Sequence, residues 1–121
     1  MSVTRRILIV DDDDAVCETL SDVLEAVGYH TVIAGDGEEA VTCIQKEDFG
    51  LVLMDLRMPR MNGVQAYREI KKRRPAVEAI MITAYATGDL VQEALRAGAR
   101  EVLSKPLAMD RLLTLIAAVC P

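Results

Sequence analysis

Five aliphatic runs alternate with five longer amphipathic stretches along this 121-residue chain. The runs are rich in β-branched and aliphatic residues and do not alternate with polar ones, which is typical of strands buried on both faces of a sheet. Strict alternation of such strands with helices predicts an α/β fold, a doubly wound (βα)5 parallel sheet with right-handed crossovers. We expect strands at residues 5–10, 30–34, 50–54, 77–82 and 100–104, and helices at residues 14–27, 37–47, 63–73, 87–97 and 108–119.

Several predicted helix boundaries carry their own sequence signals. Gly28 follows the first helix, where a left-handed residue is often needed. Asp36 and Asn62 are expected to cap the second and third helices, and Asp14, with Asp13 as the alternative, is expected to cap the first. The apolar face of the first helix is predicted to consist of Val16, Leu20, Val23, Leu24 and Val27.

Length and composition restrict the class of protein. A chain of 121 residues with 51% apolar content fits one globular domain with its own core. No apolar run approaches the ~20 residues of a membrane span, and the N-terminus lacks the apolar stretch of a signal peptide. Cys17, Cys43 and Cys120 lie far apart, which disfavours zinc or disulfides and favours a reduced, cytoplasmic protein.

The charge pattern argues against a nucleic-acid-binding domain. The formal net charge is −5, whereas such domains are usually basic. A short basic run, residues 71–74, ends the third predicted helix. It either complements the helix dipole in solvent or contacts a partner.

Acidic residues and one lysine stand at the ends of three predicted strands. Asp11 and Asp12 follow the first aliphatic run, Asp55 ends the third, and Lys105 follows the fifth. Parallel sheets bring the carboxyl ends of their strands to one edge, where such sheets bind ligands. Converging carboxylates repel one another unless a hard cation neutralises them, and carboxylate oxygens with waters suit Mg²⁺. The sequence therefore predicts a divalent-cation and phosphoryl site.

The residues alone leave the roles at this site open. Asp55 is either a metal ligand only or a nucleophile that forms an acyl phosphate. Lys105 contacts phosphoryl oxygens or forms a structural ion pair with Asp55. Thr83 ends the fourth strand, where its hydroxyl could donate to a phosphoryl oxygen. No glycine-rich phosphate cradle is present, and His30, the only histidine, starts the second strand far from this edge.

Taken together, these motifs resemble the receiver domain of two-component response regulators of the chemotaxis-regulator kind. The matching residues occur in order along essentially the whole chain, at Asp11-Asp12, Asp55 to Pro59 with Gly63, Thr83-Ala84 and Lys105-Pro106. The resemblance implies a flavodoxin-like sheet of order 2-1-3-4-5. It also implies one receiver domain over residues 1–121, alone or as the N-terminal part of a longer regulator. The ending without a polar tail, residues 118–121, favours the second reading.

The resemblance implies a phosphorylation-activated signalling switch. A sensor histidine kinase or a histidine phosphotransfer protein would donate a phosphoryl group to Asp55. The chain would then be a phosphoacceptor that assists its own phosphorylation and dephosphorylation, not an enzyme. Mg²⁺ would be held by Asp11, Asp12, Asp55 and the backbone carbonyl of Arg57.

The same resemblance indicates which residues respond to phosphorylation. Thr83 and Lys105 would grip the phosphoryl group, and the Lys105-Pro106 bond is expected to be cis. Thr83 would then move toward the phosphate and reshape the face made by the fourth helix, fifth strand and fifth helix. Partners are expected to bind this face. The switch and partner positions are Thr83, Ala84, Tyr85, Val102 and Pro106.

Two departures from the family pattern concern the switch and the phosphoryl lifetime. Val102 stands where the family usually has Tyr or Phe, so no aromatic ring can swing there. Tyr85 is expected to take over part of the motion. Arg57 and Tyr85 occupy the two variable positions that flank the phosphoryl group, where their long side chains are expected to hinder the attacking water.

The fifth predicted helix is apolar nearly all round. Leu112, Leu113 and Ile116 supply its core face. A helix with further apolar faces tends to be covered, so we expect a homodimer or an output domain there; the alternative is that the spare residues are tolerated in solvent. The residues predicted to lie on these other faces are Leu115, Ala118 and Val119.

Two other functions remain to be compared with the signalling switch. A dehalogenase-type enzyme with a nucleophilic Asp would need a second acid two residues later, where this chain has Arg57. A receiver-like binding module that is not phosphorylated would be expected to lack one of the acids or the lysine, all of which are present. No DNA-binding, cyclase or kinase segment identifies the output.

Overall fold

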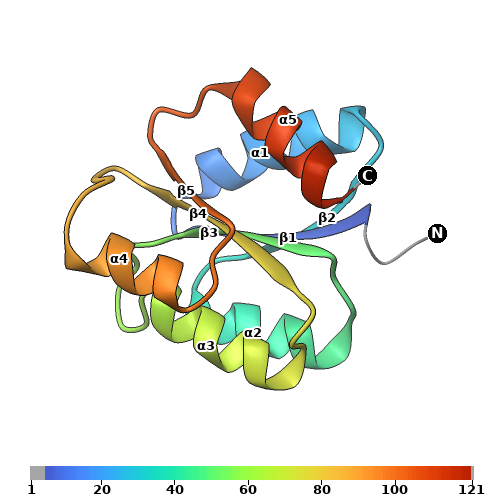
Figure 1. The fold of residues 1–121 in the computed structure, drawn as a ribbon. Helices are drawn as coiled ribbons and strands as arrows, with labels where there is room; N and C mark the ends of the chain where they lie inside the picture. Colours follow the sequence, from blue (N-terminus) through green and yellow to red (C-terminus); the bar gives the residue numbers. More distant parts are fainter. Residues whose placement is uncertain (1–4, 121) are drawn as a thin grey trace.

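Residues 5–120 of the computed structural model form a five-stranded parallel sheet with helices on both faces (Figure 1). The strand order is β2-β1-β3-β4-β5, which confirms the predicted flavodoxin-like topology. The strands are β1 (Arg6–Val10), β2 (His30–Ala34), β3 (Leu51–Asp55), β4 (Glu78–Thr83) and β5 (Glu101–Ser104). The helices are α1 (Asp14–Ala26), α2 (Gly37–Lys46), α3 (Gly63–Arg73), α4 (Asp89–Arg96) and α5 (Met109–Val119).

The sheet separates two apolar clusters. Helices α1 and α5 cover one face, while α2, α3 and α4 cover the other (Figure 1). In β1, Leu8 and Val10 point to the side of α2 and α3, and Ile7 and Ile9 point to the side of α1 and α5. Both sets are buried because successive side chains of a strand alternate between faces. Burial on both faces explains why the strand sequences are mostly aliphatic and do not alternate between apolar and polar residues.

Helix α1 begins at residue 14 as predicted, but its cap and its last residue differ from the first choice by one residue each. The N-cap is Asp13, the alternative to Asp14: its carboxylate accepts hydrogen bonds from the N–H groups of Ala15 and Val16. Four consecutive aspartates all fit the cap pattern, so the sequence could not choose among them. At the other end the helix stops at Ala26, and Val27 is 48% exposed instead of belonging to the apolar face.

The caps of α2 and α3 agree with the prediction. The Asp36 side chain accepts a hydrogen bond from the N–H of Glu39. Asn62 and Gln65 form a reciprocal capping box. In the described part of the chain, no helix is long and apolar enough to cross a lipid bilayer.

Helix α5 is covered more completely than the sequence suggested. Leu112 and Ile116 are buried as predicted. Leu115 and Val119, predicted to lie on other faces, instead pack against the cluster shared with α1. The prediction that these two lie away from the core face was wrong, because both are half-buried side chains that reach this cluster. Only Ala118 of the three is exposed.

Gly63, the first residue of α3, lies against the strand that ends in Asp55. A Cβ at this position would lie 2.9 Å from the Asp55 carbonyl oxygen and 3.0 Å from the Leu56 Cα. Backbone atoms cannot move aside as a flexible side chain can. We expect Gly63→Ala to lower the free energy of unfolding by about 1–3 kcal/mol, measured by urea denaturation.

Gly35→Ala is the matched control for this substitution. A Cβ on Gly35 would have only the Glu39 carboxylate near it, at 3.6 Å. We expect its effect on the free energy of unfolding to stay below about 1 kcal/mol. Equal losses in the two variants would show that the close approach of α3 to β3 does not require glycine.

Candidate functional site

The parallel register brings the ends of four strands to one edge of the sheet. Val10 pairs with Met54, Asp55 with Ile82, and Thr83 with Ser104. Residues at or just after these positions therefore meet in space, as predicted for Asp11, Asp12, Asp55, Thr83 and Lys105.

Three carboxylates form the centre of this edge. Oxygens of Asp11, Asp12 and Asp55 lie within 4.8 Å of one another, close enough to hold one metal ion. Asp11 and Asp55 are only 3% and 7% exposed, whereas Asp12 faces solvent. Burial is the main cause that raises the pKa of the Asp55 carboxyl, and the charge of Asp11 adds to it; the Arg57 N–H and Lys105 act in the opposite direction.

Lys105 is the cation of the cluster. Its Nζ donates to Asp11 Oδ2 at 3.2 Å and to Asp55 Oδ2 at 3.5 Å. Burial alone would lower the pKa of this amine, but the hydrogen bond to Asp11 and the charges of both acids outweigh burial and raise it. The Lys105-Pro106 bond is cis, as expected from the resemblance.

One ammonium does not balance three carboxylates. With Lys105 counted, two negative charges remain uncompensated in a cluster of which two acids are buried. A divalent cation supplies the missing charge, and oxygen-only ligands fit a hard ion such as Mg²⁺. The donor set of the chain therefore fits the metal predicted from the sequence.

The Thr83 hydroxyl is held in a turn with Tyr85. Thr83 is fully buried, and its Oγ1 accepts from the Tyr85 N–H at 3.1 Å and donates to the Tyr85 carbonyl at 3.3 Å. Ala84 and Tyr85 are exposed, with 68% of Tyr85 accessible. The hydroxyl can reach another acceptor only by releasing the Tyr85 carbonyl.

Arg57 and Tyr85 contact each other across the site. The Arg57 guanidinium lies 5.7 Å from the centre of the Tyr85 ring, a cation–π arrangement. The Arg57 N–H meanwhile donates to Asp55 Oδ1 at 3.2 Å. The sequence identified both residues as flanking positions but not their mutual contact, because nothing in their spacing signals it.

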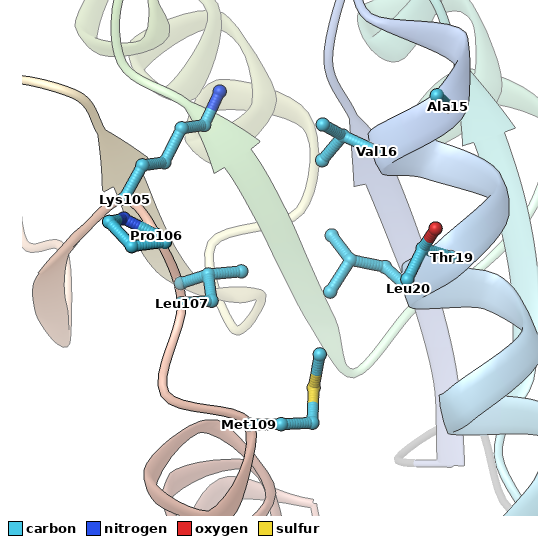
Figure 2. A pocket seen from close by; sticks show the side chains of 8 residues that line it. All are labelled: Ala15, Val16, Thr19, Leu20, Lys105, Pro106, Leu107 and Met109. Carbon is cyan, nitrogen blue, oxygen red and sulfur yellow. The ribbon is translucent and has the colours of Figure 1, made fainter.

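A hollow beside Lys105 was not predicted. It has a volume of about 370 Å³ and lies between the first turns of α1 and the segment that joins β5 to α5. In Figure 2 the Lys105 amine points toward the carboxyl end of β3, and the apolar side chains face each other below it. The available signal was the apolar character of residues that follow Lys105. The lining residues are Ala15, Val16, Thr19, Leu20, Lys105, Pro106, Leu107 and Met109.

The remaining predicted residues lie around this centre or away from it. Pro106 is exposed next to Lys105, at the rim of the hollow. Val102 is half-buried and packs against the cluster that includes Val91 of α4. His30 is exposed at the first residue of β2, at the opposite end of the sheet from the acids.

Residues 7–117 match the response regulator receiver domain family. The transcriptional regulatory protein ZraR of Klebsiella oxytoca is 40% identical over 106 residues, which cover 88% of this chain and 24% of that protein. The chain thus spans about a quarter of the length of this relative.

Solved structures agree with this match. A CheY-like receiver domain from Methanospirillum hungatei JF-1 superposes with a TM-score of 0.90 at 37% identity, over 93% of this chain and 90% of that one. The response regulator TrrA of Thermotoga maritima, solved in complex with Mg(2+)-BeF, gives 0.85 at 31% identity, over 94% and 97% of the two chains. Both the sequence match and the sheet topology lead to one conclusion: the chain belongs to the response regulator receiver domain family.

Proposed function

We propose that this chain is a phosphorylation-activated signalling switch. Asp55 accepts the phosphoryl group of a phosphohistidine carried by a sensor histidine kinase or a histidine phosphotransfer protein. The observation that supports this most directly is the convergence of Asp11, Asp12 and Asp55 with Lys105 at one sheet edge. The free cysteines fit a cytoplasmic protein, and a longer regulator would supply the output domain.

The transfer step follows from the site. A carboxylate oxygen of Asp55 attacks phosphorus, the P–N bond to the donor imidazole breaks, and that nitrogen keeps the electron pair. Mg²⁺, held by Asp11, Asp12, Asp55 and the carbonyl of Arg57, would neutralise charge on the phosphoryl oxygens. Lys105, which already bridges two acids, turns its ammonium to a phosphoryl oxygen.

The hollow beside Lys105 supplies a place for the donor. It is lined mainly by apolar side chains and by Lys105 (Figure 2), whose amine contacts the acceptor carboxylate of Asp55. An apolar residue of the donor that enters it would fix the phosphohistidine over Asp55. Such pre-positioning reduces the entropic cost of bringing the two reactants together.

The switch begins at Thr83. Its hydroxyl donates to the phosphoryl group and releases the Tyr85 carbonyl that it now holds. The segment between β4 and α4 then takes a new conformation, and the face of α4, β5 and α5 changes for an output domain or a second copy. The half-buried Val102 leaves no aromatic ring on β5 to take part.

The acceptor is tested by intact mass after incubation with Mg²⁺ and acetyl phosphate. We expect wild type to gain one phosphoryl group and Asp55→Asn to gain none. Asp48→Asn, an exposed acid away from the site, is the control and should react as wild type does. A gain in Asp55→Asn would place the acceptor elsewhere, and no gain from a cognate donor in wild type would favour a binding module that is not phosphorylated.

The charge imbalance at the site predicts an effect on stability. The pKa of Asp55 is raised, so the folded state binds this proton more tightly than the unfolded state. Without Mg²⁺, protonation of Asp55 stabilises the folded state at acidic pH. This stabilisation is lost as pH rises from about 4, the pKa of an unfolded Asp, through the raised pKa of the folded state. We expect Asp55→Asn to raise the free energy of unfolding at pH 7 by on the order of 1 kcal/mol.

The same variant should lose the response to Mg²⁺. A ligand at tenfold above its Kd stabilises the folded state by about 1.4 kcal/mol, which we expect in wild type but not in Asp55→Asn. Asp22→Asn, an exposed acid on α1, is the control and should keep the response. Equal stabilisation of Asp55→Asn by Mg²⁺ would contradict the assigned ligand set.

Arg57 and Tyr85 are proposed to lengthen the life of the aspartyl phosphate. The Arg57 guanidinium lies over the Tyr85 ring, and the Arg57 N–H binds Asp55 Oδ1, so the pair lies next to the acceptor and would obstruct a water molecule. We expect Arg57→Ala and Tyr85→Ala each to speed dephosphorylation by about threefold to tenfold, a barrier change of roughly 0.7–1.4 kcal/mol. Loss of phosphate is followed by mass spectrometry after acetyl phosphate is removed.

Arg68→Ala is the control for the loss of a positive charge. It removes an exposed arginine from α3 without touching the stacked pair. Its dephosphorylation rate should match that of wild type. Unchanged rates in Arg57→Ala and Tyr85→Ala would show that the pair does not limit access of water.

A further inference from the structure

Charge is distributed unevenly along this chain. Residues 57–74 contain seven of its 14 Lys and Arg residues but a single acid, although the chain as a whole carries −5. Residues 11–25 contain seven acids and no Lys or Arg. The metal site accounts for only two of these seven acids, Asp11 and Asp12. The proposed phosphoryl transfer explains neither the remaining acids nor the basic segment.

The basic segment presents cations outward from α3 and the loop before it. Arg60, Arg68 and Lys72, which we call the α3 basic surface, are exposed around a hollow of about 380 Å³. Arg68 forms no ion pair with any residue of the described range 5–120. Arg60 and Lys72 each pair with an acid, Asp36 and Glu69, but both side chains are 70% exposed. Exposed pairs of this kind are weak and exchange readily.

The acids of α1 form the opposite surface. Asp14, Glu18 and Asp22, which we call the α1 acidic surface, are exposed on successive turns of the helix. None of the three forms an ion pair within residues 5–120. Like charges four residues apart on a helix destabilise it. This helix therefore carries a repulsion that no contact in the described part of the chain relieves.

The two surfaces match in spacing but cannot meet in one molecule. Glu18 and Asp22 are four residues apart, as are Arg68 and Lys72, and four residues of helix span about 6 Å. Helix α1 covers one face of the sheet and α3 covers the other (Figure 1). A second copy of the chain carries the charges complementary to each of these surfaces, acids on α1 and basic residues on α3.

We propose that the α3 basic surface of one copy docks on the α1 acidic surface of a second copy. Because the two surfaces differ, the contact is head-to-tail, and each copy keeps one surface free for a further copy. The net negative charges of the copies repel at long range, but salt screens that repulsion beyond about 8 Å at 0.15 M, whereas the facing charges are much closer. The contact weakens in high salt.

The test is a charge exchange measured by sedimentation equilibrium at about 50 mM and about 500 mM salt. Arg68→Glu/Lys72→Glu removes the basic surface, and Glu18→Lys/Asp22→Lys removes the acidic one. We expect wild type to self-associate more at low salt, and each double variant alone to lose at least about tenfold in association constant. An equimolar mixture of the two variants should associate again, because the first keeps its acidic surface and the second its basic surface.

Two further variants control for net charge. Glu38→Lys and Lys46→Glu change exposed residues of α2, which lies outside both charged surfaces and outside the face of α4, β5 and α5. Each changes the net charge by half as much as the corresponding double variant and should associate as wild type does. Circular dichroism establishes that each variant is folded. If a reversal unfolds the protein, Arg68→Gln/Lys72→Gln and Glu18→Gln/Asp22→Gln repeat the test with smaller changes.

Three results would overturn the proposal. The first is a wild-type protein that stays monomeric up to about 1 mM at low salt. The second is a mixture of the two reversed variants that does not associate. The third is an association that only one of the two variants weakens. A monomeric wild type whose α3 basic surface binds poly-glutamate or a short oligonucleotide would assign that surface to a different anionic partner.

Discussion

The contact on which the site depends is the bridge that Lys105 makes between Asp11 and Asp55. It joins the first, third and fifth strands through side chains, across a point where two acids are buried. A buried carboxylate without a partner is costly, so the lysine makes the cluster tolerable in the absence of metal. It does not make the cluster neutral, and the remaining negative charge favours the binding of a cation at this edge.

Backbone contacts fix the geometry of this bridge. The Asp13 N–H donates to Asp11 Oδ1 at 2.9 Å, so the turn that starts α1 also orients the first acid. The Lys105 N–H donates to the Thr83 carbonyl at 2.8 Å, which ties the lysine to the end of β4. Gly63 lets α3 approach the Asp55 carbonyl. The site is therefore held by secondary-structure ends and needs few side-chain contacts of its own.

The position of the site at strand ends explains why the sequence could predict most of its residues. Asp11, Asp55, Thr83 and Lys105 stand at strand ends, and strand ends in a parallel sheet meet by topology, so reading the strands located the residues. Contacts that depend on how helices and loops pack against one another could not be predicted from the sequence. The Arg57–Tyr85 contact joins two loops, and the hollow beside Lys105 lies between α1 and the segment after β5. The partial burial of Leu115 depends on how α5 packs against the sheet.

Thr83 links the bridge to the surface of the protein. Its hydroxyl is the one group at the site that is fully buried and also bonded to an exposed loop residue, Tyr85. Tyr85 is in turn stacked on Arg57, whose N–H binds Asp55. A change at Asp55 thus reaches Tyr85 by two routes, through the hydroxyl and through the guanidinium. The first route ends on the Tyr85 backbone and the second on its ring, which is 68% exposed. With Val102 on β5, Tyr85 is therefore the aromatic residue in contact with this site among the described residues.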